Sequence, residues 1–213
     1  MEENRIYNID CMNGFKNIPD KSIDLILTDI PYDEVNRKSN GLRNLDKKEA
    51  DVATFILEDF LKECDRVCRG SFYIFCGFTQ VSEIDIYFKT HKISDRVIVW
   101  EKTNPSPMNA KSIWLSGIEL CVYGKKPKAT FNSFYRSPVL RYKVARNKRH
   151  ATEKNLDLFR ELIRISSNEG DLVLDPCIGS GTTFEASMLE KRKCIGFELD
   201  KSNYDVAIER ISL

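Results

Sequence analysis

A run of apolar residues ends in an unusual group of side chains that could do chemistry. The stretch LILTDIPYDE, residues 25–34, passes from a hydrophobic half into Asp29, Ile30, Pro31 and Tyr32. A simple turn after a buried strand favours Gly or Asn and needs no large aromatic residue. A carboxylate, a rigid proline and a flat ring within four residues instead indicate a site. For this stretch taken alone, a chance Pro-Tyr at a strand end remains the alternative.

A second strand end carries a glycine turn. Residues 170–183 read GDLVLDPCIGSGTT, so an apolar strand reaches Asp175 and a Gly-Ser-Gly turn follows at 179–181. Glycines let a ligand approach the backbone, and the N-terminus of the next helix offers unpaired N–H groups to an anion. The Gly-Lys-Ser/Thr of a phosphate-binding loop and the GxGxxG of a dinucleotide site are both missing.

A third acid follows the glycine turn by about 20 residues, a spacing typical of ribose-binding acids. The strand KCIGFE, residues 193–198, ends in Glu198, whose carboxylate can accept both hydroxyls of a ribose. A ribose partner beside a glycine turn without a phosphate-binding lysine predicts a nucleoside ligand that lacks phosphates. S-adenosylmethionine fits this description, and its methionine carboxylate could sit at the helix N-terminus.

The elements that must position these acids alternate along the chain. Near-continuous apolar runs predict strands, and apolar residues at helical spacing predict amphipathic helices. The expected strands are 22–28, 71–76, 96–101, 118–123, 172–175 and 193–198, and the expected helices are 54–69, 80–89, 153–166, 181–191 and 200–211. This order predicts an α/β fold with a mostly parallel sheet and helices on both faces. Ligands of such sheets bind at the carboxyl ends of the strands, at a topological switch point.

Composition limits the class of protein. The chain has 213 residues, 42% of them hydrophobic, which is enough for one domain with a sizeable core. No apolar run approaches the ~20 residues of a membrane span, and the first residues do not resemble a signal peptide. Seven cysteines without a CxxC pair indicate reduced thiols and a cytoplasmic location. With two histidines in the chain, Cys64 and Cys68 are expected to be core thiols, and we expect no metal site.

Charge is distributed unevenly. Residues 125–149 contain nine Lys or Arg and no acid, whereas the rest of the chain carries 24 basic and 32 acidic residues. Aromatic residues are interleaved with these cations: Phe131, Phe134, Tyr135 and Tyr142. Basic residues grip phosphates and aromatic rings can stack or wedge, so the segment predicts a polyanionic partner. A solvated basic loop is the alternative.

Taken together, these motifs resemble those of the DNA amino-methyltransferases, the N4-cytosine/N6-adenine family. The family's catalytic motif, (Asp/Asn/Ser)-Pro-Pro-(Tyr/Phe/Trp), is matched by DIPY at 29–32, and its cofactor motif DPFxGSGTT is matched by DPCIGSGTT at 175–183. HATEKN at 150–155 resembles the family's HPTQKP, and Asp10-Cys11 resembles its N-terminal Asp-Cys. The catalytic motif precedes the cofactor motif, which is the family's β-type order, and the resemblance covers nearly the whole chain.

The resemblance implies a reaction. An exocyclic amino group is a poor nucleophile because its lone pair is delocalised into the base. Acceptors on Asp29 and the Ile30 carbonyl would favour a pyramidal nitrogen, while Pro31 stiffens the turn and Tyr32 stacks on the base. A base in a duplex must be flipped out to reach such a pocket. The family comparison therefore implies methylation of adenine N6 in duplex DNA, without a covalent intermediate.

The resemblance also implies a fold, a cofactor and its ligands. The fold would be a Rossmann-like domain spanning residues 1–213 with a seven-stranded sheet, and the cofactor would be S-adenosylmethionine. Asp10 and Cys11 would approach its adenine, and Thr152 and Lys154 its methionine carboxylate. Asp10 could equally be a turn residue, and Lys154 a solvated lysine at a helix start. The full implied set of cofactor-binding residues is Asp10, Cys11, Asp29, Thr152, Lys154, Asp175, Pro176, Gly179, Ser180, Gly181, Thr182 and Glu198.

The basic segment lies where β-type enzymes place their target-recognition region, at about 125–150. Its implied DNA-binding residues are Lys125, Lys126, Lys128, Arg136, Arg141, Lys143, Arg146, Lys148 and Arg149. The polar loop 33–53, with Arg37, Lys38 and Arg43, could close over DNA. Because the recognition region is short, a homodimer is a possible assembly, and a cognate restriction endonuclease is a possible partner.

Departures from the family pattern keep alternatives open. Ile30 replaces the first proline of the catalytic motif, and HATEKN differs from HPTQKP at three positions, so an inactive DNA- or cofactor-binding relative is conceivable. An initial Asp favours adenine, but N4-cytosine methylation remains an alternative. RNA or protein-glutamine methylation is less favoured, because those enzymes usually place the cofactor motif first. Cys177 follows Pro176 as in C5-cytosine enzymes, yet it lies within the cofactor turn and has no apparent base beside it.

Overall fold

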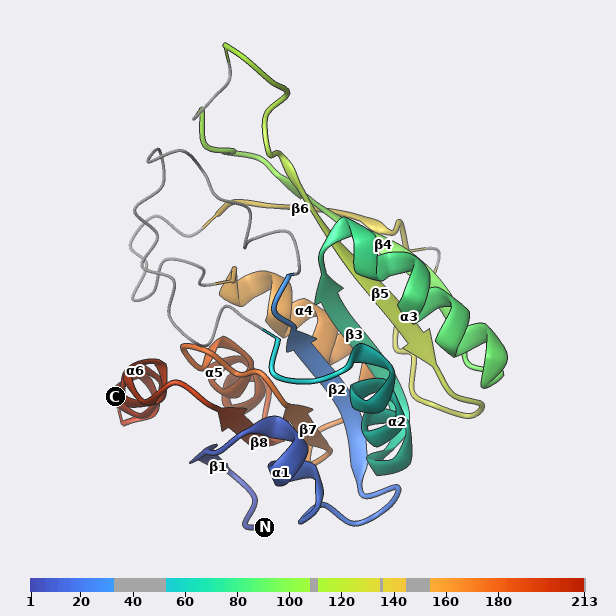
Figure 1. Ribbon diagram of the computed structural model, residues 1–213, viewed down its shortest axis with the longest axis vertical. Helices are drawn as coiled ribbons and strands as arrows, with labels where there is room; N and C mark the ends of the chain where they lie inside the picture. The colour runs from blue at the N-terminus through green and yellow to red at the C-terminus, as the bar shows by residue number, and fades with distance from the viewer. Residues whose placement is uncertain (33–52, 108–110, 135, 145–153, 213) are drawn as a thin grey trace.

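The computed structural model describes residues 1–32, 53–107, 111–134, 136–144 and 154–212 (Figure 1). Its strands are β1 (Arg5–Asn8), β2 (Ile23–Asp29), β3 (Cys68–Cys76), β4 (Ser94–Lys102), β5 (Ile118–Lys125), β6 (Val139–Tyr142), β7 (Leu172–Asp175) and β8 (Lys193–Glu198). Its helices are α1 (Cys11–Phe15), α2 (Leu57–Val67), α3 (Phe78–Thr90), α4 (Leu156–Ser166), α5 (Thr182–Leu189) and α6 (Lys201–Ile211). Residues 33–52, where a polar loop was predicted, and residues 145–153, which include the end of the basic segment, lie outside the described residues.

The described strands form one sheet in the order β1-β8-β7-β2-β3-β5-β4-β6. Only β5 runs against its neighbours, pairing antiparallel with β3 and β4. The predicted α/β class and mostly parallel sheet are therefore confirmed, but the sheet has eight strands instead of seven. The strands β1 and β6 and the helix α1 were not predicted, because RIYN, VLRY and CMNGF show neither a continuous apolar run nor a helical period.

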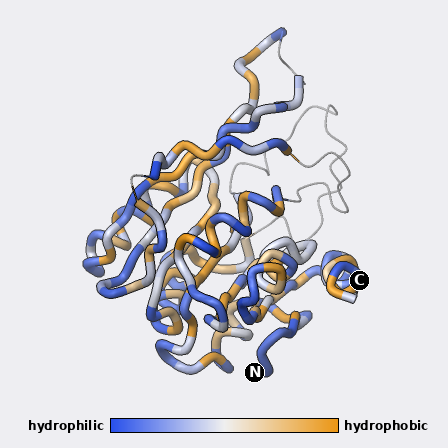
Figure 2. The backbone as a smooth tube through the Cα atoms, turned by 180° about the vertical axis from the view of Figure 1, so that it is seen from behind, coloured by the Kyte–Doolittle hydropathy of each residue, from blue (hydrophilic) through white to orange (hydrophobic). Residues whose placement is uncertain are grey.

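Both faces of the sheet are covered by helices (Figure 1). One hydrophobic core joins the sheet to α1, α2 and α3, and a second joins it to α4, α5 and α6. Alternate residues of β3 serve the two cores, with Phe72 and Ile74 in the first and Tyr73 and Phe75 in the second. Strands buried on both faces read as continuous apolar runs, and the central strands are mainly hydrophobic in Figure 2.

The switch point of the sheet lies between β2 and β7. The chain leaves β2 toward β3 on one side and leaves β7 toward β8 on the other, while β2 and β7 are themselves paired in parallel. Asp29 is the last residue of β2 and Asp175 the last of β7. Because carboxyl ends of parallel strands meet at one edge, the topology places the two predicted acids side by side.

Thiols and membrane segments can also be assessed. All seven cysteines are free; Cys177 is partly exposed and the others are buried. Cys64 ends up in α2, but Cys68 begins β3 instead of sharing the helix face. Within the described ranges, no cluster of three His, Cys, Asp or Glu side chains could hold a metal, and no helix is long and apolar enough to cross a membrane.

Gly70 provides a test of the β2–β3 pairing. A Cβ atom at Gly70 would lie 1.8 Å from the backbone oxygen of Asp24, at the irregular step in the β2–β3 register. Gly70→Ala should therefore force the strands apart and lower the free energy of unfolding by roughly 1–3 kcal/mol. Urea unfolding measures the change. Gly117→Ala is the matched control, since its new Cβ would meet nothing closer than 3.9 Å; equal stability losses in both variants would contradict the prediction.

Candidate active site

The turn after β2 is held by backbone and side-chain hydrogen bonds. The Ile30 N–H donates to the Phe75 carbonyl at 3.1 Å, and the Ile30 side chain is buried in the first core. Proline could not donate this bond, so isoleucine extends the β2–β3 ladder by one step. Gln80 braces the next peptide by donating from Nε2 to the Pro31 carbonyl at 3.0 Å. The departure from the family motif is thus accommodated in an ordered turn.

Asp29 is contacted on both carboxylate oxygens. The Tyr32 hydroxyl donates to Oδ1 at 2.9 Å, and the Lys154 ammonium lies 3.0 Å from Oδ2. Burial raises the pKa of Asp29, and the positive charge of Lys154 opposes that rise. The Asp29 side chain is 26% exposed, so part of the carboxylate faces the outside of this edge. Burial also raises the pKa of Tyr32 well above its usual value, which keeps the phenol a donor.

Lys154 joins Asp29 to a second acid. Its side chain is nearly buried, and its ammonium lies 2.5 Å from Glu119 Oε2 and 3.2 Å from the Tyr32 hydroxyl. Glu119 in turn places Oε1 2.9 Å from the ammonium of Lys102. Burial would lower the pKa of Lys154, but Asp29 and Glu119 together raise it, so the lysine is charged. The alternative of a solvated Lys154 is therefore wrong.

No sequence motif marked Glu119 or Lys102. Glu119 lies in β5 and Lys102 ends β4, both far along the chain from Asp29. The antiparallel pairing of these two strands brings the residues together, because Glu101 lies opposite Ile118. A polar residue within each of the strands RVIVWEK and IELCVY was the available signal.

The glycine turn after β7 is tied to two acids. Asp175 accepts from the Thr183 hydroxyl and, at 3.0 Å, from the Cys177 N–H. The N–H of Gly179 donates to Glu198 Oε2 at 2.9 Å. Gly179 and Gly181 have φ values of 54° and 84°, in the left-handed region that favours glycine. These hydrogen bonds fix the ends of β7 and β8 against the turn that precedes α5.

A small cleft of about 50 Å³ connects these parts. It is lined by Ile9, Asp10, Cys11, Pro31, Thr54, Phe55, Pro176, Cys177, Phe197, Glu198 and Leu199. Asp10 caps α1 by accepting from the Met12 N–H, and its second oxygen accepts from the Thr54 hydroxyl at 2.9 Å. Thr54 and Phe55 were missed by the sequence motifs. Pro31 belongs to the Asp29 turn and also to the cleft, so the two halves of the site adjoin.

Known proteins resemble this chain in sequence and fold. A family model described as DNA methylase matches residues 111–209. The type II methyltransferase M.HinfI of Haemophilus influenzae is 29% identical over 98% of this chain and 68% of its own length. The DNA adenine methyltransferase YhdJ of Escherichia coli strain K12 is 26% identical over 100% and 84%. The crystal structure of the M1.HpyAVI–SAM complex aligns with a TM-score of 0.76 and 28% identity, covering 97% of this chain and 98% of the other. This chain is therefore similar, over nearly its whole length, to DNA methyltransferases.

S-adenosylmethionine is the cofactor that these similar proteins indicate, and the cleft suits a nucleoside. The residues that line this cleft include Phe55, Phe197 and Pro176, which are apolar, and the acids Asp10 and Glu198. Burial raises the pKa of Glu198, whose Oε1 also accepts the Asp200 N–H at 2.8 Å. Each carboxylate oxygen retains acceptor capacity beyond these bonds. These acceptors, together with the apolar lining, therefore fit a ribose and an adenine.

Other cofactor residues inferred from the family motif take several positions. Ser180 and Thr182 are buried within the glycine turn after β7. The Arg210 guanidinium donates to the Ser180 carbonyl and the Thr182 hydroxyl. Thr152 lies outside the described residues. A hydrogen bond with Cys11 and burial raise the pKa of Cys177 well above its usual value. A protonated thiol is a poor nucleophile, which disfavours C5-cytosine chemistry.

The structure does not bring the predicted DNA-binding residues together. β5 runs antiparallel, so its last residue Lys125 lies opposite Ser71, at the edge of the sheet away from Asp29. Lys126 and Lys128 follow there, and Lys126 pairs with Asp65. β6 returns to the site edge, where Arg141 pairs with Glu101 and Lys143 follows. Arg146, Lys148 and Arg149 lie outside the described residues.

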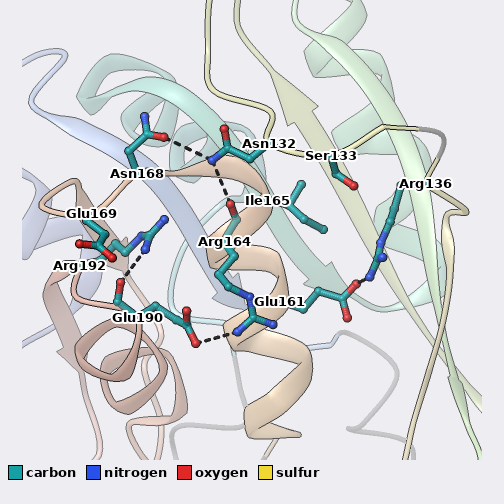
Figure 3. A pocket seen from close by; sticks show the side chains of 10 residues that line it. All are labelled: Asn132, Ser133, Arg136, Glu161, Arg164, Ile165, Asn168, Glu169, Glu190 and Arg192. Carbon is teal, nitrogen blue, oxygen red and sulfur yellow. Dashed lines mark hydrogen bonds and ion pairs between the residues drawn. The ribbon is translucent and has the colours of Figure 1, made fainter.

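Arg136 lines a separate, larger hollow of about 680 Å³ (Figure 3). Arg136 pairs with Glu161, Arg164 lies 2.7 Å from Glu190, and Arg192 donates to the Glu190 and Ser167 carbonyls. The hollow lies at the carboxyl ends of α4 and α5, and both helices begin at the site edge. These arginines therefore contact acids and backbone carbonyls, and they lie away from Asp29.

Asp175 predicts a pH dependence of stability. Burial raises the pKa of Asp175 from 3.8 to about 7 in the folded protein. The folded state therefore binds this proton more tightly than the unfolded state, so this group lowers the free energy of unfolding as the pH rises from about 4 to 7. Asp175→Asn should flatten that decline, because the amide does not ionise. Urea unfolding across this pH range measures it, and identical pH profiles for the two proteins would contradict the prediction.

Proposed function

We propose that this protein transfers the methyl group of S-adenosylmethionine to the N6 amino group of an adenine flipped out of duplex DNA. The observation that carries the proposal is the shared edge: the Asp29 turn and the nucleoside cleft meet at Pro31. An acceptor for an amino group and a site for a methyl donor are therefore adjacent. When bound, the cofactor supplies an electrophilic methyl group on a sulfonium.

The residues of the turn can prepare the amino group for attack. Asp29 and the Ile30 carbonyl would each accept one N–H of the amino group, which favours a pyramidal nitrogen with a localised lone pair. The partly exposed carboxylate of Asp29 is where such a nitrogen would arrive. Pro31 fixes the backbone between acid and ring. The reaction needs positioning and hydrogen bonding, and no covalent enzyme intermediate.

Tyr32 is the proposed platform for the base. Its ring lies against Gly77, where an added Cβ would sit 3.3 Å from the Tyr32 Cβ. Its hydroxyl donates to the same carboxylate that the amino group of the base would use. Before the substrate binds, the Tyr32 hydroxyl satisfies the Asp29 carboxylate as a hydrogen-bond donor. The amino group of an entering base would then replace this hydroxyl.

We assign the cofactor through the cleft. Glu198 would accept the ribose hydroxyls, Asp10 and Cys11 would border the adenine, and the glycine turn at 179–181 would approach the methionine part. Thr152 is retained as a candidate for the methionine carboxylate. Lys154 was a candidate for the same role, but its ammonium contacts Asp29, Glu119 and Tyr32.

The partners proposed for the enzyme follow from the substrate. Duplex DNA would be held at the site edge, with Arg141 and Lys143 as its described basic residues and the loop beyond them as the recognition region. A cytoplasmic location follows from DNA as the substrate. A homodimer would supplement the short recognition region, and a restriction endonuclease acting on the same sequence is a candidate partner.

Direct chemistry tests the proposal. Protein and labelled S-adenosylmethionine are incubated with unmethylated genomic DNA, and nucleosides are separated by mass spectrometry. We expect N6-methyladenine, and its loss in Asp29→Ala because the acceptor is removed. Asp205→Ala, at an exposed ion pair on α6, is the matched control and should retain activity. Detection of N4-methylcytosine instead would show that cytosine is the target base. Cofactor binding without any methylated nucleoside would favour an inactive relative.

Tyr32 separates the roles of ring and hydroxyl. Tyr32→Phe keeps the ring and should retain transfer within a few-fold of the original rate. Tyr32→Ala removes stacking, which is worth about 1–3 kcal/mol per base, so the rate of single-turnover transfer should fall about 10- to 100-fold. Quenched single-turnover assays measure both variants. Equal losses in the two variants would assign the effect to the hydroxyl and refute the stacking role.

A further inference from the structure

The ammonium of Lys154 is saturated by three acceptors. Asp29 Oδ2 lies 3.0 Å away, Glu119 Oε2 2.5 Å away and the Tyr32 hydroxyl 3.2 Å away. A lysine has three N–H donors and no acceptor, so each donor has one partner. Three directions fix the position of the nitrogen more strongly than a single ion pair would. The Lys154 ammonium also lies 5.6 Å from the centre of the buried Phe75 ring.

The Glu119 carboxylate lies between the ammonium groups of two lysines. One oxygen faces Lys154 and the other faces Lys102, and its side chain is 18% exposed. The cluster thus holds two carboxylates and two ammonium groups with no net charge. Burying charges costs several kcal/mol per ion, and apolar residues of similar size are often as stable or more so. A buried charge cluster that touches the proposed acceptor of the reaction is therefore a candidate for a functional role.

We propose that Glu119 is a positioning residue for methyl transfer: it holds the Lys154 ammonium back from Asp29, so that the carboxylate keeps its orientation and enough acceptor strength for the target amino group. This role rests on the proposed function of Asp29. Without Glu119, the lysine would have Asp29 as its one carboxylate partner. A tighter Lys154–Asp29 pair would compete with the N–H groups of the substrate for the same oxygens.

The groups that face Asp29 predict opposite effects of the two neighbours. Glu119 raises the pKa of Asp29 and Lys154 lowers it. The other described groups that interact with Asp29 are Tyr32, Cys76, Cys121 and Asp175, and burial raises the pKa of each. Asp175 titrates at about pH 7, but it is present in every variant and cancels in a comparison.

The experiment follows the Asp29 carboxyl directly by carbon-13 NMR across pH, with the resonance assigned by its absence in Asp29→Asn. Glu119→Gln should lower the titration midpoint and Lys154→Met should raise it, each by about one pH unit, as expected for removal of one close charge. Glu169→Gln is the matched control, because Glu169 forms an exposed ion pair with Lys191 at the other edge of the sheet. It should leave the midpoint unchanged.

Activity provides the second readout. In single-turnover transfer at saturating DNA and cofactor, Glu119→Gln should be at least about tenfold slower, while its Kd for S-adenosylmethionine stays within about threefold. An unchanged Asp29 midpoint in Glu119→Gln overturns the proposal. Weaker cofactor binding with an unchanged rate at saturation also overturns it, because Glu119 would then act through the cofactor.

Two further outcomes remain decisive. If Glu119→Gln does not fold, Lys102→Met is used: Glu119 then has Lys154 as its one cation, draws it away from Asp29, and the Asp29 midpoint should rise. An unchanged midpoint there overturns the proposal. If the unaltered protein methylates no DNA, the proposed function fails, and the NMR midpoints still decide whether Glu119 and Lys154 control the Asp29 carboxyl.

Discussion

Parallel pairing of β2 with β7 is the constraint on which the site depends. The two strands are neighbours although more than 140 residues separate them, and each ends in an aspartate at the same edge. Crossovers leave them in opposite directions, and ligands of such sheets bind in the crevice at this switch point. The turn that carries Asp29 and the turn that carries the glycines therefore face one another without any long-range motif in the sequence. Pro31 belongs to the Asp29 turn and lines the cleft, so it marks where the two halves of the candidate site meet.

The antiparallel strand β5 adds the chemistry that this constraint alone does not supply. Because β5 runs against β3 and β4, its first residues lie at the carboxyl edge of the parallel strands. Glu119 is thereby delivered to the Asp29 turn, and Lys125 is carried to the far edge. One reversal of strand direction explains both the acid that the motifs did not mark and the separation of the basic segment into two groups.

The same geometry explains which elements and site residues could be predicted from the sequence. Long apolar strands and amphipathic helices are local patterns, so the α/β class and eleven of the element positions could be read directly, whereas β1, β6 and α1 show neither a continuous apolar run nor a helical period. Asp29 and Asp175 stand out because they interrupt apolar runs. Glu119, Lys102 and Thr54 do not, since their roles arise from strand pairing and loop packing. Lys154 was identified by its motif, but its contacts with two acids depend on the fold.

The two strand-end aspartates show how one edge can hold acids of different character. Asp175 receives its hydrogen bonds from a hydroxyl and a backbone N–H, and burial raises its pKa to about 7. Asp29 is also buried, yet the ammonium of Lys154 opposes the loss of its charge. An acceptor for a weakly acidic amino group must stay ionised, while an acid that only braces a turn need not. The two carboxylates therefore differ in their neighbours: the Lys154 ammonium lies beside Asp29, and Glu119 contacts the same ammonium.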